Sequence, residues 1–374
     1  MPLLQFAKLV RQSEFYFTRP TQRPAAVPDD SSLLTNLLKS VSRSFYLSLR
    51  ILPAPLRRPM SLGYLLARAA DTIADTEIIR REKRIEYLES FRCQVEADEV
   101  EPSLFREIGG SLTGHQNSPA EKVLLERLAE AACLLNNTSS EDRDQLKFVL
   151  RGLITGMIQD LENFPGNSPQ ELQAFETTDQ LDSYIYHAAG IVGEFWTSLC
   201  CTHLPALSEW DQKEMKKAGI RFGKGLQLVN VLKDTPRDLC NGRCYYPVSL
   251  LKQAGLCPSD LLCADNGPKF AVIENQIIQM ALGHFIEADN YILAIPRREI
   301  RLRLACIWPL WIGLKTLALI AAERSILSPE LNLKITRSEV NRLVGQSLGA
   351  VCSNSMMHGY TARFMDEVSM TIGQ

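Results

Sequence analysis

Apolar residues recur at helical spacing through almost the whole chain from Ser31 onward. One stripe consists of Leu146, Val149, Leu150, Leu153 and Met157, and similar stripes precede and follow it. Alternating apolar and polar residues, the pattern of a half-buried strand, are nearly absent. The sequence therefore predicts one all-α domain over residues 31–374, with about ten or more helices. Residues 1–30, which carry three prolines among polar residues, are expected to form a flexible tail.

Composition excludes several classes of protein. Hydrophobic residues make up 45% of the 374 residues, and the formal charge is 41 − 43 = −2, which leaves no electrostatic footprint for nucleic acid. The ten cysteines include no C-x-x-C pair, so reduced thiols and a cytoplasmic location are expected. The apolar run 305–322 contains Pro309 and Lys315, which favours a buried core helix over a membrane span. Peripheral contact of an apolar flank with a membrane is the alternative.

Four polar residues interrupt the helical segment that begins at Tyr64. Tyr64, Arg68, Asp71 and Asp75 stand at offsets 0, 4, 7 and 11 and fall within about 60° of one another on a helix. The opposite face is apolar, as a core-facing helix requires.

A second segment repeats this arrangement. Gln227, Asn230, Asp234 and Asp238 form a stripe about 80° wide. Aspartates four residues apart repel each other in a helix, so two such pairs call for a compensating cation. Carboxylates bind Mg²⁺, with Mn²⁺ as an alternative, and Mg²⁺ takes its remaining ligands from water and substrate phosphates. A solvated acidic face is the competing interpretation.

Two further segments have both a functional and a structural interpretation. Ser42, Arg43 and Ser44 could donate to phosphate, although they equally suit a helix cap. The segment from Tyr184 to Gly193 is rich in small residues, which admit either an apolar substrate or a neighbouring helix.

Together these segments resemble the squalene and phytoene synthase family. The matching pieces are SVSRSF, YLLARAADTIAD, YIYHAAGIVGE, LQLVNVLKDTPRD and GRCYYP, in the family's order between about Ser40 and Pro247. The resemblance implies the all-α isoprenoid (terpenoid) synthase fold, with a central apolar pocket.

The resemblance also implies a reaction. Family members join two prenyl diphosphates, such as farnesyl diphosphate, through a cyclopropylcarbinyl intermediate, presqualene diphosphate when the substrates are C15. Reducing members then use NADPH to form squalene, whereas non-reducing members form phytoene or dehydrosqualene or stop at presqualene diphosphate. The sequence itself sets neither the C15 or C20 chain length nor the oligomeric state.

The resemblance implies a role for each position that matches the family's motifs. Asp71, Asp75, Asp234 and Asp238 are the expected metal ligands, and Tyr64, Tyr184, Phe45 and Arg68 the expected catalytic side chains. The diphosphate contacts are expected at Ser42, Arg43, Ser44, Arg68, Lys233, Arg243, Gln227 and Asn230.

The C-terminal extension, residues 323–374, resembles that of the reducing squalene synthases. Within it Lys334 and Arg337 are the expected NADPH contacts, with a solvated helix end as the alternative. The sequence therefore favours a Mg²⁺- and NADPH-dependent squalene synthase of the soluble bacterial type, without a membrane anchor. A non-reducing synthase and a non-catalytic assembly protein are the alternatives.

Two positions depart from the family pattern. Ala74 stands where reducing members commonly have Glu, and Pro236 lies inside the second aspartate pair, where it is expected to kink the helix. Both could alter the metal geometry.

Overall fold

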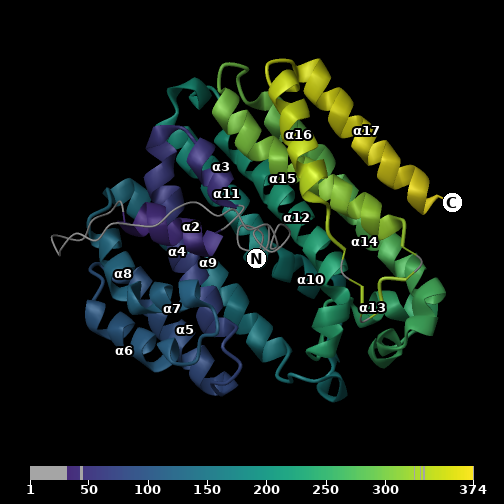
Figure 1. Ribbon diagram of the computed structural model, residues 1–374, viewed down its shortest axis with the longest axis horizontal. Helices are drawn as coiled ribbons and strands as arrows, with labels where there is room; N and C mark the ends of the chain where they lie inside the picture. The colour runs from purple at the N-terminus through teal and green to yellow at the C-terminus, as the bar shows by residue number, and fades with distance from the viewer. Residues whose placement is uncertain (1–31, 43–44, 324, 329, 332, 374) are drawn as a thin grey trace.

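The computed structural model describes residues 32–42, 45–323, 325–328, 330–331 and 333–373. The predicted tail, residues 1–30, lies outside them. Figure 1 shows a helical bundle in which α4 to α8 lie on one side and the C-terminal helices α14 to α17 on the other. The all-α prediction is confirmed.

Most of the chain forms α-helices. Their bounds are α2 (Leu38–Ser42), α3 (Phe45–Ile51), α4 (Ala54–Ala74), α5 (Arg81–Glu96), α6 (Pro102–Thr113), α7 (Pro119–Glu126), α8 (Leu128–Asn136), α9 (Ser140–Asn163), α10 (Thr178–Ile185), α11 (Ile191–His203), α12 (Gln212–Cys240), α13 (Val248–Leu251), α14 (Gly267–Ala294), α15 (Ile300–Ala321), α16 (Arg337–Ala350) and α17 (Asn354–Ile372). π-Helical turns occupy Ser32–Leu37 and Tyr186–Gly190, and 3₁₀ turns lie at Pro169–Glu171, Pro205–Leu207, Lys252–Ala254, Pro258–Leu262 and Ala264–Asn266.

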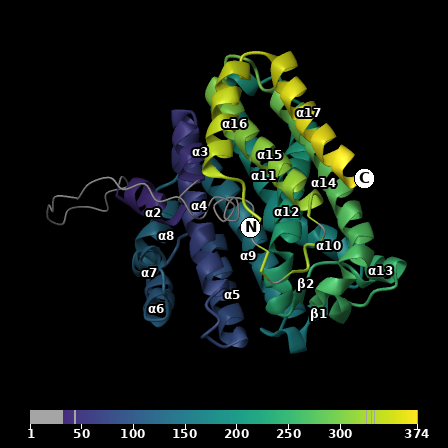
Figure 2. The same cartoon turned by 45° about the vertical axis from the view of Figure 1, so that its right-hand side comes forward.

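Two strands of two residues each were not expected from the sequence. β1 (Gln173–Ala174) and β2 (Arg243–Cys244) pair in parallel, with Gln173 opposite Arg243. Gly242, with φ +75°, makes the turn from α12 into β2, and glycine adopts this left-handed conformation without steric cost. The pairing fixes Arg243 and the residues after it against the segment that leads into α10 (Figure 2).

Helix α4 is buried on every side over most of its length. Pro55 lies in its first turn, where a missing backbone N–H costs nothing, and all residues from Pro59 to Ala74 are buried. Arg68 and Asp71 are therefore buried polar residues within a core helix, where they need partners.

The α11–α12 interface explains the small residues after Tyr184. A Cβ atom at Gly193 would lie 1.8 Å from the carbonyl oxygen of Gly219, and one at Gly223 would lie 2.3 Å from that of Ala189. These glycines therefore serve helix packing, the structural one of the two interpretations.

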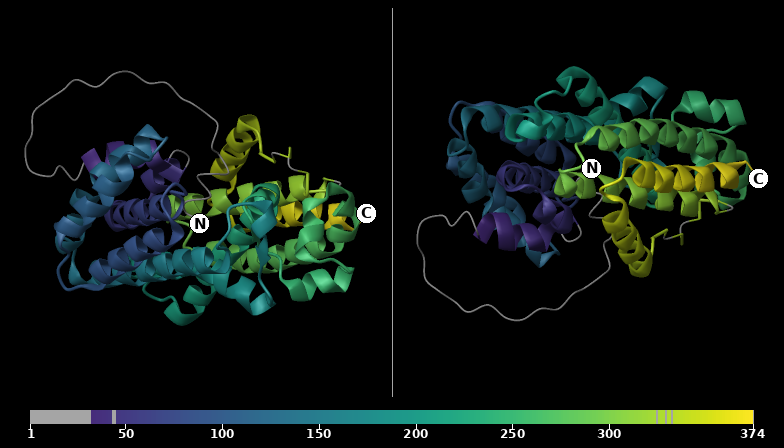
Figure 3. Two further views of the ribbon diagram at one scale, coloured as in Figure 1. Left: turned by 90° about the horizontal axis from the view of Figure 1, so that it is seen from below. Right: turned by 90° about the horizontal axis from the view of Figure 1, so that it is seen from above.

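The C-terminal extension forms two helices, α16 and α17, that pack on α15 (Figure 3). Buried Arg303 donates to Asn354 (2.7 Å), and Trp311 donates to Thr361 (3.0 Å). Among the described residues α15 is the one helix long and apolar enough to cross a membrane, but 67% of that window is buried in the bundle. Its Lys315 pairs with Glu367 of α17 at 2.6 Å.

Candidate functional site

A cavity of about 330 Å³ opens where α4, α9 and α12 end. Side chains from α4, α7, α9, α10, α12 and β2 line it. The two predicted aspartate segments, 163 residues apart between Asp71 and Asp234, thus reach one end of the bundle, as the stripe argument requires.

Arg68 lies on the cavity wall between two carboxylates. It donates to Asp71, one helical turn away at 2.5 Å, and to Glu121 of α7. Burial acts to lower the pKa of Arg68, but Asp71 and Glu121 outweigh it and raise that pKa. The guanidinium group is therefore held ionised at the cavity, with Nε lacking a partner among the described residues. Glu121 was not predicted, because its contact with Arg68 spans 53 residues.

The first aspartate pair spans the end of α4. Asp71 lies in the last turn, whereas Asp75 is the C-cap residue, and both line the cavity. Arg84 of α5 donates to the carbonyl oxygen of Ala74 at 2.6 Å and so secures this helix end. Ala74 itself lines the cavity, where a longer acidic side chain would reduce the space.

The second aspartate pair lies on the last turns of α12, and only one of its two members lines the cavity. Asp238 lines the cavity, whereas Asp234 does not and pairs with Lys233 at 2.8 Å and Arg237 at 3.5 Å. Burial lowers the pKa of Lys233 despite the nearby Asp234 carboxylate. The helix α12 continues through Pro236 to Cys240, so the proline does not end it.

The cavity wall carries an excess of negative charge. Six acidic residues line it (Asp71, Asp75, Glu77, Glu121, Asp160, Asp238) against three arginines (Arg68, Arg237, Arg243), a formal balance of 3 − 6 = −3. Among the described residues no group of three or more His, Cys, Asp or Glu side chains is placed to hold a metal ion. This donor set fits Mg²⁺ that is shared between one or two carboxylates and a phosphorylated ligand.

Asp160 of α9 is the second cavity residue that the sequence argument missed. It accepts hydrogen bonds from Arg243 at 3.0 Å and from the Tyr245 hydroxyl at 2.9 Å. Burial raises the pKa of Asp160, although Arg243 and Tyr245 act to lower it. The sequence did offer one signal for Asp160. It stands three residues after Met157, so it places a charged residue on the same helix face as the apolar stripe of α9.

Aromatic rings form the wall beside Asp160. Tyr184 and Tyr245 stack with centroids 4.5 Å apart and planes at 19°, and Phe164 and Phe175 surround them at 5.1 to 5.8 Å. Gln227 of α12 donates to the Tyr184 hydroxyl at 3.1 Å, and Asn230 lies one turn further along the same helix. Gln227 and Asn230 are buried and do not line the cavity, so they support its wall.

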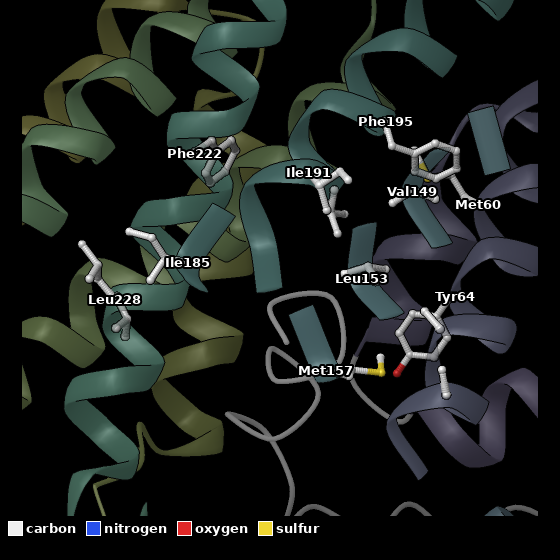
Figure 4. Close-up of a cluster of buried hydrophobic side chains, with 14 of the residues drawn as sticks. Met60, Tyr64, Val149, Leu153, Met157, Ile185, Ile191, Phe195, Phe222 and Leu228 are labelled. Carbon is white, nitrogen blue, oxygen red and sulfur yellow. The ribbon is translucent and has the colours of Figure 1, made fainter. Parts of the chain in front are cut away.

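Buried apolar side chains continue the site into the bundle. Tyr64 is 2% exposed and belongs to the buried cluster with Leu153 and Met157 (Figure 4). Of these three, Leu153 and Met157 line the cavity. The cluster extends through Val149 and Ile191 between α9 and α11. The site thus joins a charged mouth to an apolar interior.

Four of the predicted site residues have side chains outside the described ones, and two more belong to the C-terminal extension. The side chains of Ser42, Arg43, Ser44 and Phe45 lie outside those that the structure describes. Lys334 is half-buried before α16 and Arg337 is exposed in its first turn, and neither lines the cavity. Thr336 and Glu339 form a capping box at this helix end.

Residues 38–339 match the sequence profile described as squalene/phytoene synthase. A bifunctional lycopene cyclase/phytoene synthase from Gibberella fujikuroi is 30% identical over 264 residues, which is 70% of this chain and 42% of that protein. Squalene synthase ERG9 from Saccharomyces cerevisiae is 26% identical over 314 residues, 83% of this chain and 66% of that protein. The chain thus spans about two fifths of the length of the bifunctional relatives.

Solved structures share the fold at low sequence identity. TcSQS in complex with E5700 superposes with a TM-score of 0.69 at 20% identity, over 93% of this chain and 97% of that one. A dehydrosqualene synthase with ligand gives 0.60 at 17% identity, over 86% and 95% of the two chains. Squalene synthase HpnC from Alicyclobacillus acidocaldarius gives 0.52 at 18% identity, over 76% and 91%.

Proposed function

The chain belongs to the squalene/phytoene synthase family, a family of isoprenoid prenyltransferase-type enzymes, and on that premise we propose that it is a squalene synthase. It would join two farnesyl diphosphates head to head into presqualene diphosphate and then reduce this intermediate to squalene with NADPH.

The observation that carries the proposal is the charge of the cavity. A wall with a formal balance of −3 repels a diphosphate unless divalent cations accompany it. Asp71 and Asp75 on one side and Asp238 on the other would hold Mg²⁺, with Asp234 joining if it leaves Lys233. Bound Mg²⁺ would neutralise the diphosphate and make it a better leaving group.

The remaining cavity residues supply orientation. Arg68 and Arg243, both ionised beside carboxylates, would hold the diphosphate oxygens at the mouth. The prenyl chains would enter the apolar cluster around Leu153 and Met157, which excludes water from the allylic cation. Tyr64 and Tyr184 would face that cation from opposite elements, α4 and α10. An apolar product would leave most readily into a membrane surface.

The reducing branch is supported by the C-terminal extension. The helices α16 and α17 are an integral layer on α15, and the alignment with yeast squalene synthase covers 83% of this chain, against 70% for the Gibberella phytoene synthase. Lys334 and Arg337 are the proposed NADPH contacts. Because neither residue lines the cavity, the bound nucleotide would have to reach from this extension to the mouth.

A non-reducing synthase is the second candidate. The 30% identity to a bifunctional lycopene cyclase/phytoene synthase favours it. A non-catalytic assembly protein is the remaining alternative, and the four aspartates argue against it, since such a role does not need them.

Product analysis by gas chromatography–mass spectrometry tests the proposal. The purified chain is incubated with Mg²⁺ and farnesyl diphosphate, with and without NADPH, and in parallel with geranylgeranyl diphosphate. Squalene formed only with NADPH is the expected result. Dehydrosqualene or phytoene in both tubes would assign the non-reducing branch, and no turnover of either substrate would assign the non-catalytic role.

A further inference from the structure

A single nitrogen atom of Arg237 bridges the two carboxylates of the second aspartate pair. Nη2 of Arg237 lies 3.5 Å from Oδ2 of Asp234 and donates to Oδ1 of Asp238 at 3.4 Å. Two aspartates four residues apart on one helix face repel each other, and a positive charge between them relieves that repulsion. Arg237, together with Lys233, therefore supplies from the chain itself the compensating charge that this aspartate pair needs.

Arg237 is held much less firmly than Arg68, the arginine of the first aspartate pair. The side chain of Arg68 is 8% exposed and is fixed by Asp71 at 2.5 Å and by Glu121. The side chain of Arg237 is 49% exposed, and its two contacts are longer than the ordinary distance between a charged nitrogen and a carboxylate oxygen. An exposed ion pair of this kind is weak, so Arg237 can exchange its partners at little cost.

Arg237 also lies where the two aspartate segments face each other. It lines the cavity, whereas Lys233, one turn earlier on the same helix, does not. Burial acts to lower the pKa of Arg237, but Asp234, Asp238 and, least of the three, Asp75 outweigh it and raise that pKa. Carboxylates from the ends of both α4 and α12 thus act on this guanidinium group. A diphosphate held between the two aspartate segments would come within its reach.

We propose that Arg237 occupies the carboxylates of Asp234 and Asp238 until a divalent cation binds there, and that it then contacts the diphosphate. The proposal rests on the function proposed above and adds a diphosphate contact that the sequence motifs did not predict. The exchange involves ionic contacts alone: the guanidinium group leaves two carboxylate oxygens and takes diphosphate oxygens in their place.

The exchange makes binding of the cation and binding of the diphosphate depend on each other. Without diphosphate, a cation must displace Arg237 from the carboxylates and leave the guanidinium group without a new anion. Without a cation, Arg237 stays on the carboxylates, and the negatively charged wall repels the diphosphate. Each ligand therefore favours the binding of the other, which is positive coupling between two sites.

Arg237→Gln tests the first half of the exchange, because glutamine keeps a polar side chain and removes the charge. We expect the variant to bind Mn²⁺ alone about tenfold more tightly than the unmodified chain, since no positive charge competes for the two carboxylates. The electron paramagnetic resonance signal of free Mn²⁺ measures this binding. Arg237→Lys, which keeps the charge, should bind Mn²⁺ within about threefold of the unmodified chain.

Inorganic pyrophosphate tests the second half. In saturating Mg²⁺ its Kd, measured by isothermal titration calorimetry, should rise about tenfold in Arg237→Gln, because a charged hydrogen bond to the ligand is lost. Arg237→Lys should weaken the binding less, since a lysine retains the charge without the forked geometry. Arg237→Gln thus shifts the two affinities in opposite directions, whereas loss of a merely structural residue would weaken both.

Arg151→Gln is the matched control. Arg151 of α9 is 55% exposed, lies 3.5 Å from Glu96 and does not line the cavity. Its replacement removes the same charge from the chain and should change neither affinity. Circular dichroism and the thermal midpoint of each variant exclude misfolding as the cause.

Three results would overturn the proposal. Unchanged Mn²⁺ affinity in Arg237→Gln would mean that Arg237 does not compete for the carboxylates, and unchanged pyrophosphate affinity would mean that it does not contact the diphosphate. Weaker binding of both ligands would assign it a structural role. Product analysis of the unmodified chain is a separate measurement: if no prenyl diphosphate is turned over but both expected shifts occur, the proposed function fails and the exchange is supported.

Discussion

Arg68 of α4 and Glu121 of α7 form an ion pair at the mouth of the cavity. The pair joins α4 to the layer formed by α6, α7 and α8. It also places the Glu121 carboxylate on the Arg68 guanidinium, which we propose contacts the diphosphate. Glu121 thus occupies the position on Arg68 that a diphosphate oxygen would need.

Glu121→Gln should therefore strengthen diphosphate binding. Loss of one negative charge from the wall lowers the repulsion, and Arg68 keeps Asp71 as its partner. We expect the Kd of inorganic pyrophosphate in the presence of Mg²⁺ to fall about tenfold in isothermal titration calorimetry. Glu126→Gln, on the exposed side of the same helix, is the control. Weaker binding in Glu121→Gln would show that this carboxylate helps to hold the ligand.

Asp71→Asn and Asp238→Asn should each reduce turnover of farnesyl diphosphate by about 100-fold or more, because each removes a negatively charged ligand of the proposed Mg²⁺. The Mg²⁺ concentration for half-maximal activity should rise in parallel. Asp179→Asn, an exposed residue in the first turn of α10, should change neither quantity. Full turnover in both cavity variants would contradict the metal assignment.

Lys334→Glu and Arg337→Glu should raise the KM for NADPH by about tenfold or more, the loss expected when a charged hydrogen bond to phosphate is removed. Formation of presqualene diphosphate without NADPH should be unchanged, since neither residue lines the cavity. An equal loss in both steps would indicate a structural role for this segment.

Glu274 of α14 should make stability depend on pH. Burial and the nearby Glu323 raise its pKa from 4.5 to about 8. The folded chain then binds more protons than the unfolded one between these values, so the stability contribution is complete below about pH 4.5 and is lost as pH rises through about 8. Glu274→Gln should raise the thermal midpoint at pH 9 relative to the unmodified chain and change it little at pH 5. An equal shift at both pH values would exclude titration of this group as the cause.

Gly193→Ala should destabilise the fold by about 1–3 kcal/mol, because the new methyl group would meet the backbone of α12. Gly345→Ala on α16 has open space at the same atom and should stabilise by about 0.5–1 kcal/mol. Chemical denaturation of the two variants measures both effects. A stable Gly193→Ala variant would mean that α11 and α12 can separate without cost.

The helices and the aspartate pairs could be predicted because their signals are local. A period of 3.6 residues places Asp71 beside Arg68, and Asp238 beside Asp234, whatever the remaining chain does. Glu121 and Asp160 could not be assigned in this way, because their partners lie 53 and 83 residues away in sequence. Arg243 and Tyr245 reach Asp160 only through the pairing of β1 with β2, and a strand of two residues leaves no periodic pattern to detect.

That pairing also limits how this chain can be recombined with its relatives. The segment before α10 and the segment after α12 are far apart in sequence, yet backbone hydrogen bonds from Gln173 to Gly242 and from Phe175 to Cys244 hold them in one register. A chimaera that exchanges one segment alone would shift Arg243 and Tyr245 relative to Asp160. Segments 164–177 and 242–247 should therefore be exchanged together in any engineered hybrid.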